Sequence, residues 1–116
     1  MAPRLKIKLY FDDGSYIGPG KAELLSLIAE TGSISAAAQR MSMSYKRAWS
    51  LVEVLNAMFA HPLVRSNRGG SGGGGASVTE AGQQVLAAYT ALQAGAEEGA
   101  APAIATLEAL RAPHRT

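Results

Sequence analysis

Two helical patterns separated by a break of three residues occupy the middle of this 116-residue sequence and constrain its fold more than any other feature. Ser33 can cap the first pattern, which continues to Met41, and Ser44 can cap the second, which runs from Tyr45 to about residue 56 or 57. Small residues in the first helix allow another helix to approach closely. The second helix carries an inward stripe at helical spacing, made of Ala48, Leu51, Val52 and Leu55. The pair predicts a helix–turn–helix unit.

The first 32 residues predict a small hairpin followed by a helix. Apolar and polar residues alternate with a period of two over residues 5–11, which fits a strand with one buried face. Residues 12–15 supply a turn, and residues 16–17 can form a short return strand. Pro19 suits the first position of the next helix, and Gly32 suits its end.

Residues 63–78 predict a second hairpin. Residues 63–67 form one strand and residues 76–78 its partner, while the segment between them is glycine from 69 to 75 apart from Ser71. Arg65 and Arg68 precede this tip and are placed to contact phosphate groups. We therefore expect a mainly α fold with small β-hairpins, a winged helix–turn–helix.

The C-terminal third predicts a helix that packs against another chain. Thr79 can cap it, and apolar residues keep helical spacing from Val85 to Leu92 and again from Ile104 to Leu110, with Gly95, Gly99 and Pro102 interrupting the helix between them. This stripe has little left to bury in so small a domain, which predicts a homodimer. We divide the chain into a winged helix–turn–helix domain, 1–78, and a C-terminal helical dimerisation segment of the same domain, 79–116. The alternative is a frayed end beyond Gly95.

The composition limits the classes of protein that this chain can belong to. A chain of 116 residues with 47% apolar content supports one core. The absence of Cys excludes a thiolate zinc site, a Cys nucleophile and a redox motif. No apolar run approaches the ~20 residues that span a bilayer, and no signal-type block follows the basic start. We expect a soluble, cytoplasmic protein that does not bind membranes.

The charges are distributed unevenly along the chain. Residues 40–68 contain five Lys or Arg residues against Glu53 alone, whereas residues 69–110 contain four Glu residues and no cation. A basic middle beside an acidic tail indicates one face that meets a polyanion. The alternative is that the five cations only form a solvated surface.

The order of these elements predicts that the chain binds double-stranded DNA. In a winged helix–turn–helix, the second helix lies in the major groove, where its first turns reach base edges and flanking cations meet phosphates. The candidate DNA-binding residues are Ser44, Tyr45, Lys46, Arg47, Trp49, Ser50, Arg65 and Arg68. Two alternatives remain open. The unit could be a helical hairpin with a basic face, since its turn lacks glycine, and Tyr45 and Trp49 could be core aromatics.

Four segments together resemble the N-terminal DNA-binding domain of the ModE-type molybdate-responsive regulators, over about residues 4–93. They are Gly18-Pro-Gly-Lys21, Glu30-Thr-Gly-Ser-Ile-Ser-Ala-Ala-Ala38, Met43-Ser-Tyr-Lys-Arg-Ala-Trp49 and the glycine-rich segment 69–75. The second segment is shared more loosely with LysR-type regulators. The resemblance implies a regulator that binds a palindromic operator as a homodimer, in molybdenum-related gene control. The family adds C-terminal molybdate-binding modules, which this sequence lacks up to Thr116, so we expect this chain not to sense molybdate by itself; its effector is unknown.

Three other patterns suggest chemistry that we do not expect. Gly70, Gly72 and Gly75 satisfy a dinucleotide-binding spacing, but six glycines in seven residues satisfy many patterns. His61 and His114 are too few for a metal site, and the two Asp residues at 12–13 are typical of a turn. We therefore expect no enzyme activity, no cofactor and no metal.

A different function would use the C-terminal surface. A protein-interaction module that modulates a full-length regulator by heterodimerisation would need that apolar stripe but would not need a basic recognition helix. The basic helix therefore favours DNA binding.

Overall fold

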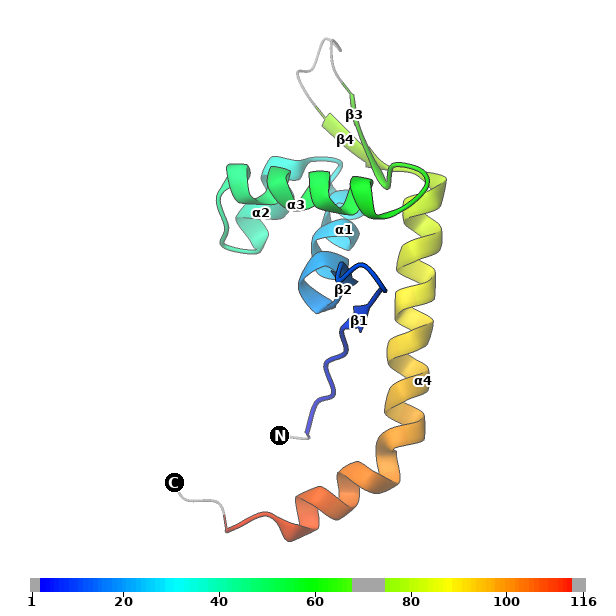
Figure 1. The fold of residues 1–116 in the computed structure, drawn as a ribbon. Helices are drawn as coiled ribbons and strands as arrows, with labels where there is room; N and C mark the ends of the chain where they lie inside the picture. Colours follow the sequence, from blue (N-terminus) through cyan, green and yellow to red (C-terminus); the bar gives the residue numbers. More distant parts are fainter. Residues whose placement is uncertain (1–2, 68–74, 114–116) are drawn as a thin grey trace.

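The computed structural model describes residues 3–67 and 75–113. These residues are mainly α-helical with two small antiparallel hairpins, as the sequence predicts (Figure 1). No helix within these ranges is both long and apolar enough to cross a membrane. In chain order the elements are β1 (Leu9–Tyr10), β2 (Tyr16–Ile17), α1 (Pro19–Thr31), α2 (Ile34–Arg40), α3 (Tyr45–Met58), β3 (Val64–Asn67), β4 (Gly75–Val78) and α4 (Glu80–Leu110).

The helix ends follow local chemistry and confirm the predicted boundaries. Pro19 opens α1, and Gly32 ends it with a left-handed φ of 69°. The Ser33 hydroxyl accepts a hydrogen bond from the N–H of Ala36 at 3.0 Å, which caps α2. The Ser44 hydroxyl caps α3 in the same way, by accepting from the N–H of Arg47 at 3.1 Å.

The break between α2 and α3 is a tight turn without glycine. Ser42 takes a φ of 55°, and the N–H of Met43 donates to the carbonyl of Ala38 at 3.0 Å. Serine at this left-handed position costs more than glycine, but the surrounding hydrogen bonds hold it. The predicted helix–turn–helix is confirmed.

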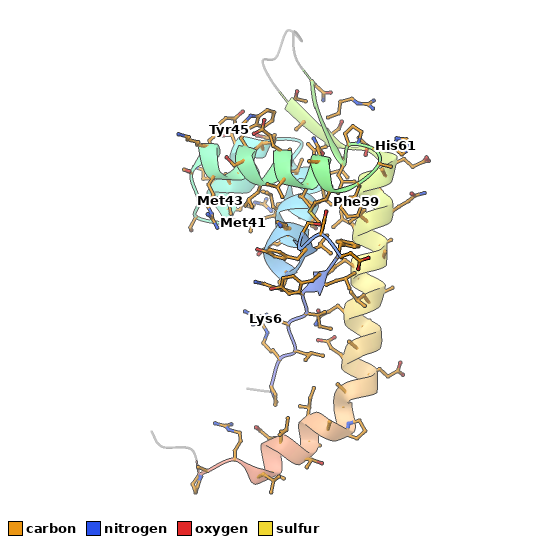
Figure 2. The ribbon with its side chains drawn as sticks, viewed as in Figure 1. Lys6, Met41, Met43, Tyr45, Phe59 and His61 are labelled. Carbon is orange, nitrogen blue, oxygen red and sulfur yellow. The ribbon has the colours of Figure 1, made fainter. Side chains whose placement is uncertain are left out.

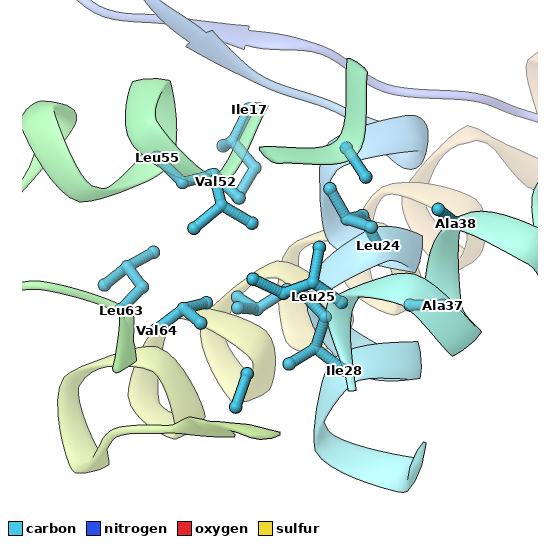
Figure 3. Packing of buried hydrophobic residues seen from close by; sticks show 13 residues of the cluster. Ile17, Leu24, Leu25, Ile28, Ala37, Ala38, Val52, Leu55, Leu63 and Val64 are labelled. Carbon is cyan, nitrogen blue, oxygen red and sulfur yellow. The ribbon is translucent and has the colours of Figure 1, made fainter. Parts of the chain in front are cut away.

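The core lies between α1, α2, α3 and the start of the second hairpin (Figure 3). Ala37 and Ala48 are fully buried, so α2 and α3 approach closely, as the small residues predict. The largest fully buried side chains are Leu24, Leu25, Ile28, Val52, Leu55 and Leu63. Burial of each such aliphatic side chain stabilises the folded state by about 1.5–3 kcal/mol. This shared core holds α3 in place.

The second hairpin attaches to the helices at both of its strands. Val64 pairs with Val78 and Asn67 with Gly75 in an antiparallel register. The N–H of Ala76 donates to the carbonyl of Gly32 at 2.9 Å, which connects β4 to the end of α1. The segment that contains Arg68 and most of the glycine tract lies outside the described residues.

The predicted strand over residues 5–11 is wrong in length and in burial. Only Leu9–Tyr10 pair with β2, and the side chains of Leu9 and Phe11 are exposed. The residues before β1 lie along α4 instead, because its side chains occupy their backbone acceptors. The Tyr89 hydroxyl donates to the carbonyl of Ile7 at 2.7 Å, and the Gln93 amide donates to the carbonyl of Leu5.

The predicted interruption of the last helix, and the alternative of a frayed end beyond Gly95, are also wrong. α4 runs without a break through Gly95, Gly99 and Pro102 to Leu110. Proline removes one backbone donor, and its ring crowds the preceding turn. The helix bends instead of ending, in the orange part of Figure 1.

Candidate nucleic-acid interface

Helix α3 has one buried face and one exposed face. Ala48, Val52 and Leu55 point into the core, which leaves Lys46 and Ser50 on the opposite side, fully outside it. This follows from the rotation of about 100° per residue in an α-helix. The two predicted DNA-binding residues therefore face solvent, where a second molecule can reach them.

Tyr45 and Trp49 lie one turn apart on the flank of α3 that faces the second hairpin. Together with Ser33 and Ser35 at the start of α2 and Asn67 of β3, they line a pocket of about 260 Å³. Trp49 is half-buried and packs against the core, whereas Tyr45 is 56% exposed. The alternative that Tyr45 is a core aromatic of this chain is therefore wrong, and Trp49 belongs to both the core and this surface.

Arg47 lies on the other flank of α3. It lines a pocket of about 200 Å³ together with Lys8, Lys21 and the two methionines of the turn between α2 and α3. In Figure 2, Tyr45 lies above α3 while Met41 and Met43 lie below it. The predicted DNA-binding residues of α3 thus divide between two flanks and the exposed ridge between them.

The cations of this surface are available to a polyanion. Among residues 3–67 and 75–113, the ion pairs are Arg40 with Glu30, and Arg111 with Glu108. Within those ranges Lys46, Arg47 and Arg65 therefore pair with no carboxylate. Unpaired cations at the N-terminal end of a capped helix are typical of a surface that meets phosphate groups.

Arg65 lies on a different part of the hairpin from Tyr45 and Trp49. It lines a depression of about 500 Å³ with His61, Thr79 and Glu80, at the point where the hairpin meets α4. Ser66 lines the pocket beside Tyr45, and Arg65 does not.

Residues 21–83 match the family described as bacterial regulatory helix-turn-helix protein, lysR family. The chain belongs to this family. This LysR-family chain is 46% identical over 82 residues to the molybdenum-pterin-binding protein MopB of Rhodobacter capsulatus, covering 71% of this chain and 30% of MopB. It is 37% identical over 89 residues to the transcriptional regulator ModE of Haemophilus influenzae, covering 77% and 34% of the two chains.

A third relative is the DNA-binding transcriptional dual regulator ModE of Escherichia coli K12, which is 39% identical over 89 residues and is covered over 32% of its length. The match to this relative covers 77% of the present chain. The chain spans about a third of the length of these curated relatives. The family is one of regulatory proteins, which agrees with the expectation that this chain is not an enzyme.

Sequence reasoning missed several residues of this LysR-family surface. Ser33, Ser35 and Asn67 meet beside Tyr45 only because α2, α3 and β3 converge there. Lys8 and Lys21 join Arg47 in the same manner on the opposite flank. No local pattern marks these residues, since the partners named here lie ten or more positions away in the sequence.

Proposed function

We propose that this chain is a transcriptional regulator that binds double-stranded DNA through the first two turns of α3. The exposed ridge of Lys46 and Ser50 enters the major groove, with Ser44 and Tyr45 at its N-terminal end. Arg47 and Trp49 lie on its two flanks. The observation that carries this proposal is a capped, solvent-exposed helix whose cations meet no carboxylate in the described residues.

The hairpin of β3 and β4 supplies the second contact. A wing beside a recognition helix lies along the DNA backbone, where Arg65 and Arg68 would meet phosphates. The position of Asn67 and Ser66 beside Tyr45 supports a wing that continues the surface of α3. Phosphate contacts fix the orientation of the protein, while α3 carries the sequence preference.

We further propose that the protein is a homodimer, with residues 1–78 binding DNA and residues 79–116 binding the partner. The Cα radius of gyration is 17.3 Å, against about 13 Å for a compact chain of this length, because α4 extends past the body. Leu107 and Leu110 are 67% and 76% exposed on this extension. A helix without tertiary packing is marginal in water, so a second copy would stabilise it.

The test is selection of bound duplexes from a random DNA pool. A two-fold dimer should enrich an inverted repeat whose half-sites are separated by one helical turn or a multiple of it. This one result would establish DNA binding, symmetry and the operator. Enrichment of nothing, with a folded protein, would contradict the proposal.

The exposed leucines of α4 also favour a second candidate function, heterodimerisation with a full-length regulator of the same family. In that case DNA selection would enrich nothing, while the chain would associate with such a regulator at micromolar concentration. The unpaired cations of α3 support the first candidate, because heterodimerisation makes no use of them.

The names of the relatives suggest a link to molybdenum, so we propose that the regulated genes are molybdenum-related and that the protein works in the cytoplasm, where bacterial DNA lies. We propose no tight molybdate site in the described residues, because Lys21 is their one buried cation and Lys8 and Arg47 beside it are exposed. An oxyanion sensor needs enclosed donors. Isothermal titration with molybdate and tungstate should give no micromolar affinity; a micromolar dissociation constant would overturn this.

A further inference from the structure

Two lysines gather around the ring of Tyr16. The Nζ atom of Lys21 lies 3.7 Å from the ring centroid, and that of Lys8 lies 4.7 Å from it. The Lys21 side chain is buried, at 8% exposure, and it donates one hydrogen bond to the carbonyl of Tyr16 at 3.0 Å. The ammonium group has three donors, so this single bond and the ring leave it capacity for a further acceptor.

Arg47 brings a third positive charge to the same pocket, and none of the residues that line it is acidic. Within the described ranges, neither ion pair involves Lys8, Lys21 or Arg47. Three like charges that converge on one pocket repel one another, and the repulsion grows where water is partly excluded. An anion in the pocket would remove this repulsion.

The start of α1 adds backbone donors to this pocket. Gly18 is the N-cap residue and offers no side chain, so no side-chain hydrogen bond caps the helix. The first N–H groups of a helix have no intrahelical partner, and the helix dipole favours negative charge there. Gly18, Pro19 and Gly20 all line the pocket, at the N-terminus of a helix of 13 residues. Pro19 has no N–H, so the first N–H groups of the helix are those of Gly20 and Lys21.

Gly18 also fixes the path of Lys8. A Cβ atom on Gly18 would lie 2.8 Å from the Cγ atom of Lys8, closer than side-chain atoms can approach. The backbone of Gly18 is extended, so glycine is required here for space and not for conformation. The stem of Lys8 therefore packs on Gly18 and reaches the pocket, while the neighbouring Lys6 does not line it.

We propose that Lys8, Lys21 and Arg47, with the first N–H groups of α1, bind one tetrahedral oxyanion of the phosphate type. The pocket of about 200 Å³ has room for such an ion and several waters, each of which occupies roughly 30 Å³. The oxyanion comes either from the DNA backbone, on the flank of α3 opposite the wing, or from a free ion in solution. The first source rests on the proposed function, and the second does not.

The free-ion source is tested by two-dimensional ¹⁵N–¹H NMR of the full chain, titrated with inorganic phosphate at constant ionic strength. The amides of Gly20 and Lys21 should shift saturably with a millimolar dissociation constant, because the pocket is open. Lys8→Met should abolish these shifts, and Lys6→Met, an exposed lysine two residues away, should preserve them. Both variants replace a surface cation by a side chain of similar length, so both should fold.

The DNA source is tested with the same variants and the selected duplex. Lys8→Met should lower the slope of log affinity against log salt by about 0.9, while Lys6→Met leaves the slope unchanged. If phosphate shifts the amides of Gly20 and Lys21 and Lys8→Met leaves the salt slope unchanged, the ligand is a free ion. If Lys8→Met lowers the salt slope, the ligand is a phosphate of the DNA backbone. The proposal is overturned if phosphate shifts neither amide and the two lysine variants have equal slopes. If the wild-type protein binds no DNA, the NMR result still decides the site.

Discussion

The side chain of Asn56 forms hydrogen bonds with both the backbone N–H and the backbone carbonyl of Val64. Its Oδ1 atom accepts from the N–H of Val64 at 3.0 Å, and its Nδ2 atom donates to the carbonyl of the same residue at 3.1 Å. The same Oδ1 atom accepts from the N–H of Leu63 at 2.8 Å. Because Asn56 lies in the last turn of α3 and Val64 begins β3, these bonds set the position of the wing relative to the helix that we propose to enter the groove.

Asn56→Ala should therefore affect stability and DNA binding together. It leaves two buried N–H groups and a carbonyl without partners, which lowers the free energy of unfolding by about 1–3 kcal/mol or more. Urea denaturation measures this loss, and a titration with the selected duplex measures the weaker binding. Asn67→Ala removes an exposed amide of β3 and serves as the control for stability alone; an equal loss of unfolding free energy in both variants would contradict this role of Asn56.

Two glycines of α4 should respond to alanine with opposite signs. A Cβ atom on Gly82 would collide with the carbonyl oxygen of Leu63 and lie 2.5 Å from Cγ1 of Val78, whereas one on Gly99 meets nothing within 4 Å. Gly99→Ala should raise the free energy of unfolding by up to about 1 kcal/mol through helix propensity. Gly82→Ala should lower it by about 1–3 kcal/mol, because the hairpin must move away from α4. Thermal unfolding of both variants checks the signs, and two increases would show that α4 packs differently.

Lys46→Ala and Arg47→Ala should weaken binding to the selected duplex. If a side chain contacts only phosphate, its removal should reduce the slope of log affinity against log salt by about one for every DNA sequence. If it contacts a base edge, its removal should cost about 1–3 kcal/mol of binding free energy at one base position. Lys6→Ala removes one positive charge from an exposed residue outside α3 and α4 and should leave the affinity unchanged. An unchanged affinity and slope in the Lys46/Arg47 double variant would refute the placement of α3 in the groove.

The double variant Leu107→Glu/Leu110→Glu should be monomeric where the wild type is a dimer. These two leucines share one face of α4 and are exposed, so charges there oppose association without disturbing the core. Sedimentation at micromolar concentration distinguishes the two states. Ala109→Glu places a charge elsewhere on the same turns and should keep the dimer. A wild-type protein that sediments as a monomer at all concentrations would count against the interface.

The contact of Tyr89 with Ile7 predicts a loss of stability at alkaline pH. Burial raises the pKa of Tyr89 above its usual value of 10.0. Above pH 10 the folded chain keeps a proton on Tyr89 that the unfolded chain releases. The stabilising contribution of the Tyr89 hydroxyl is therefore complete below pH 10 and is lost as the pH rises through the pKa of the folded state. Tyr89→Phe should lower the free energy of unfolding by about 0.5–1.5 kcal/mol at neutral pH. It should also reduce the alkaline loss, which denaturant titrations at neutral pH and near pH 11 would measure; an equal alkaline loss in both proteins would contradict the assignment.

The sequence by itself determined the ends of the first three helices and the presence of the wing. The hydroxyl groups of Ser33 and Ser44, the ring of Pro19 and the left-handed conformation of Gly32 each act on atoms no more than four residues away. Such interactions form in the same way whatever the rest of the chain does, and they are therefore readable from spacing alone.

The tertiary structure alone decided where the N-terminal segment lies, how α4 passes Pro102, and which residues share a surface. Alternation in residues 5–11 indicates a strand only if a second strand is available, and the side chains of α4 take that place. Lys8, Lys21 and Arg47 are separated by up to 39 positions and meet only because α1, α3 and the segment before β1 come together. Contacts of this kind depend on the packing of whole elements, whose relative positions are set by burial of the core and not by any local pattern.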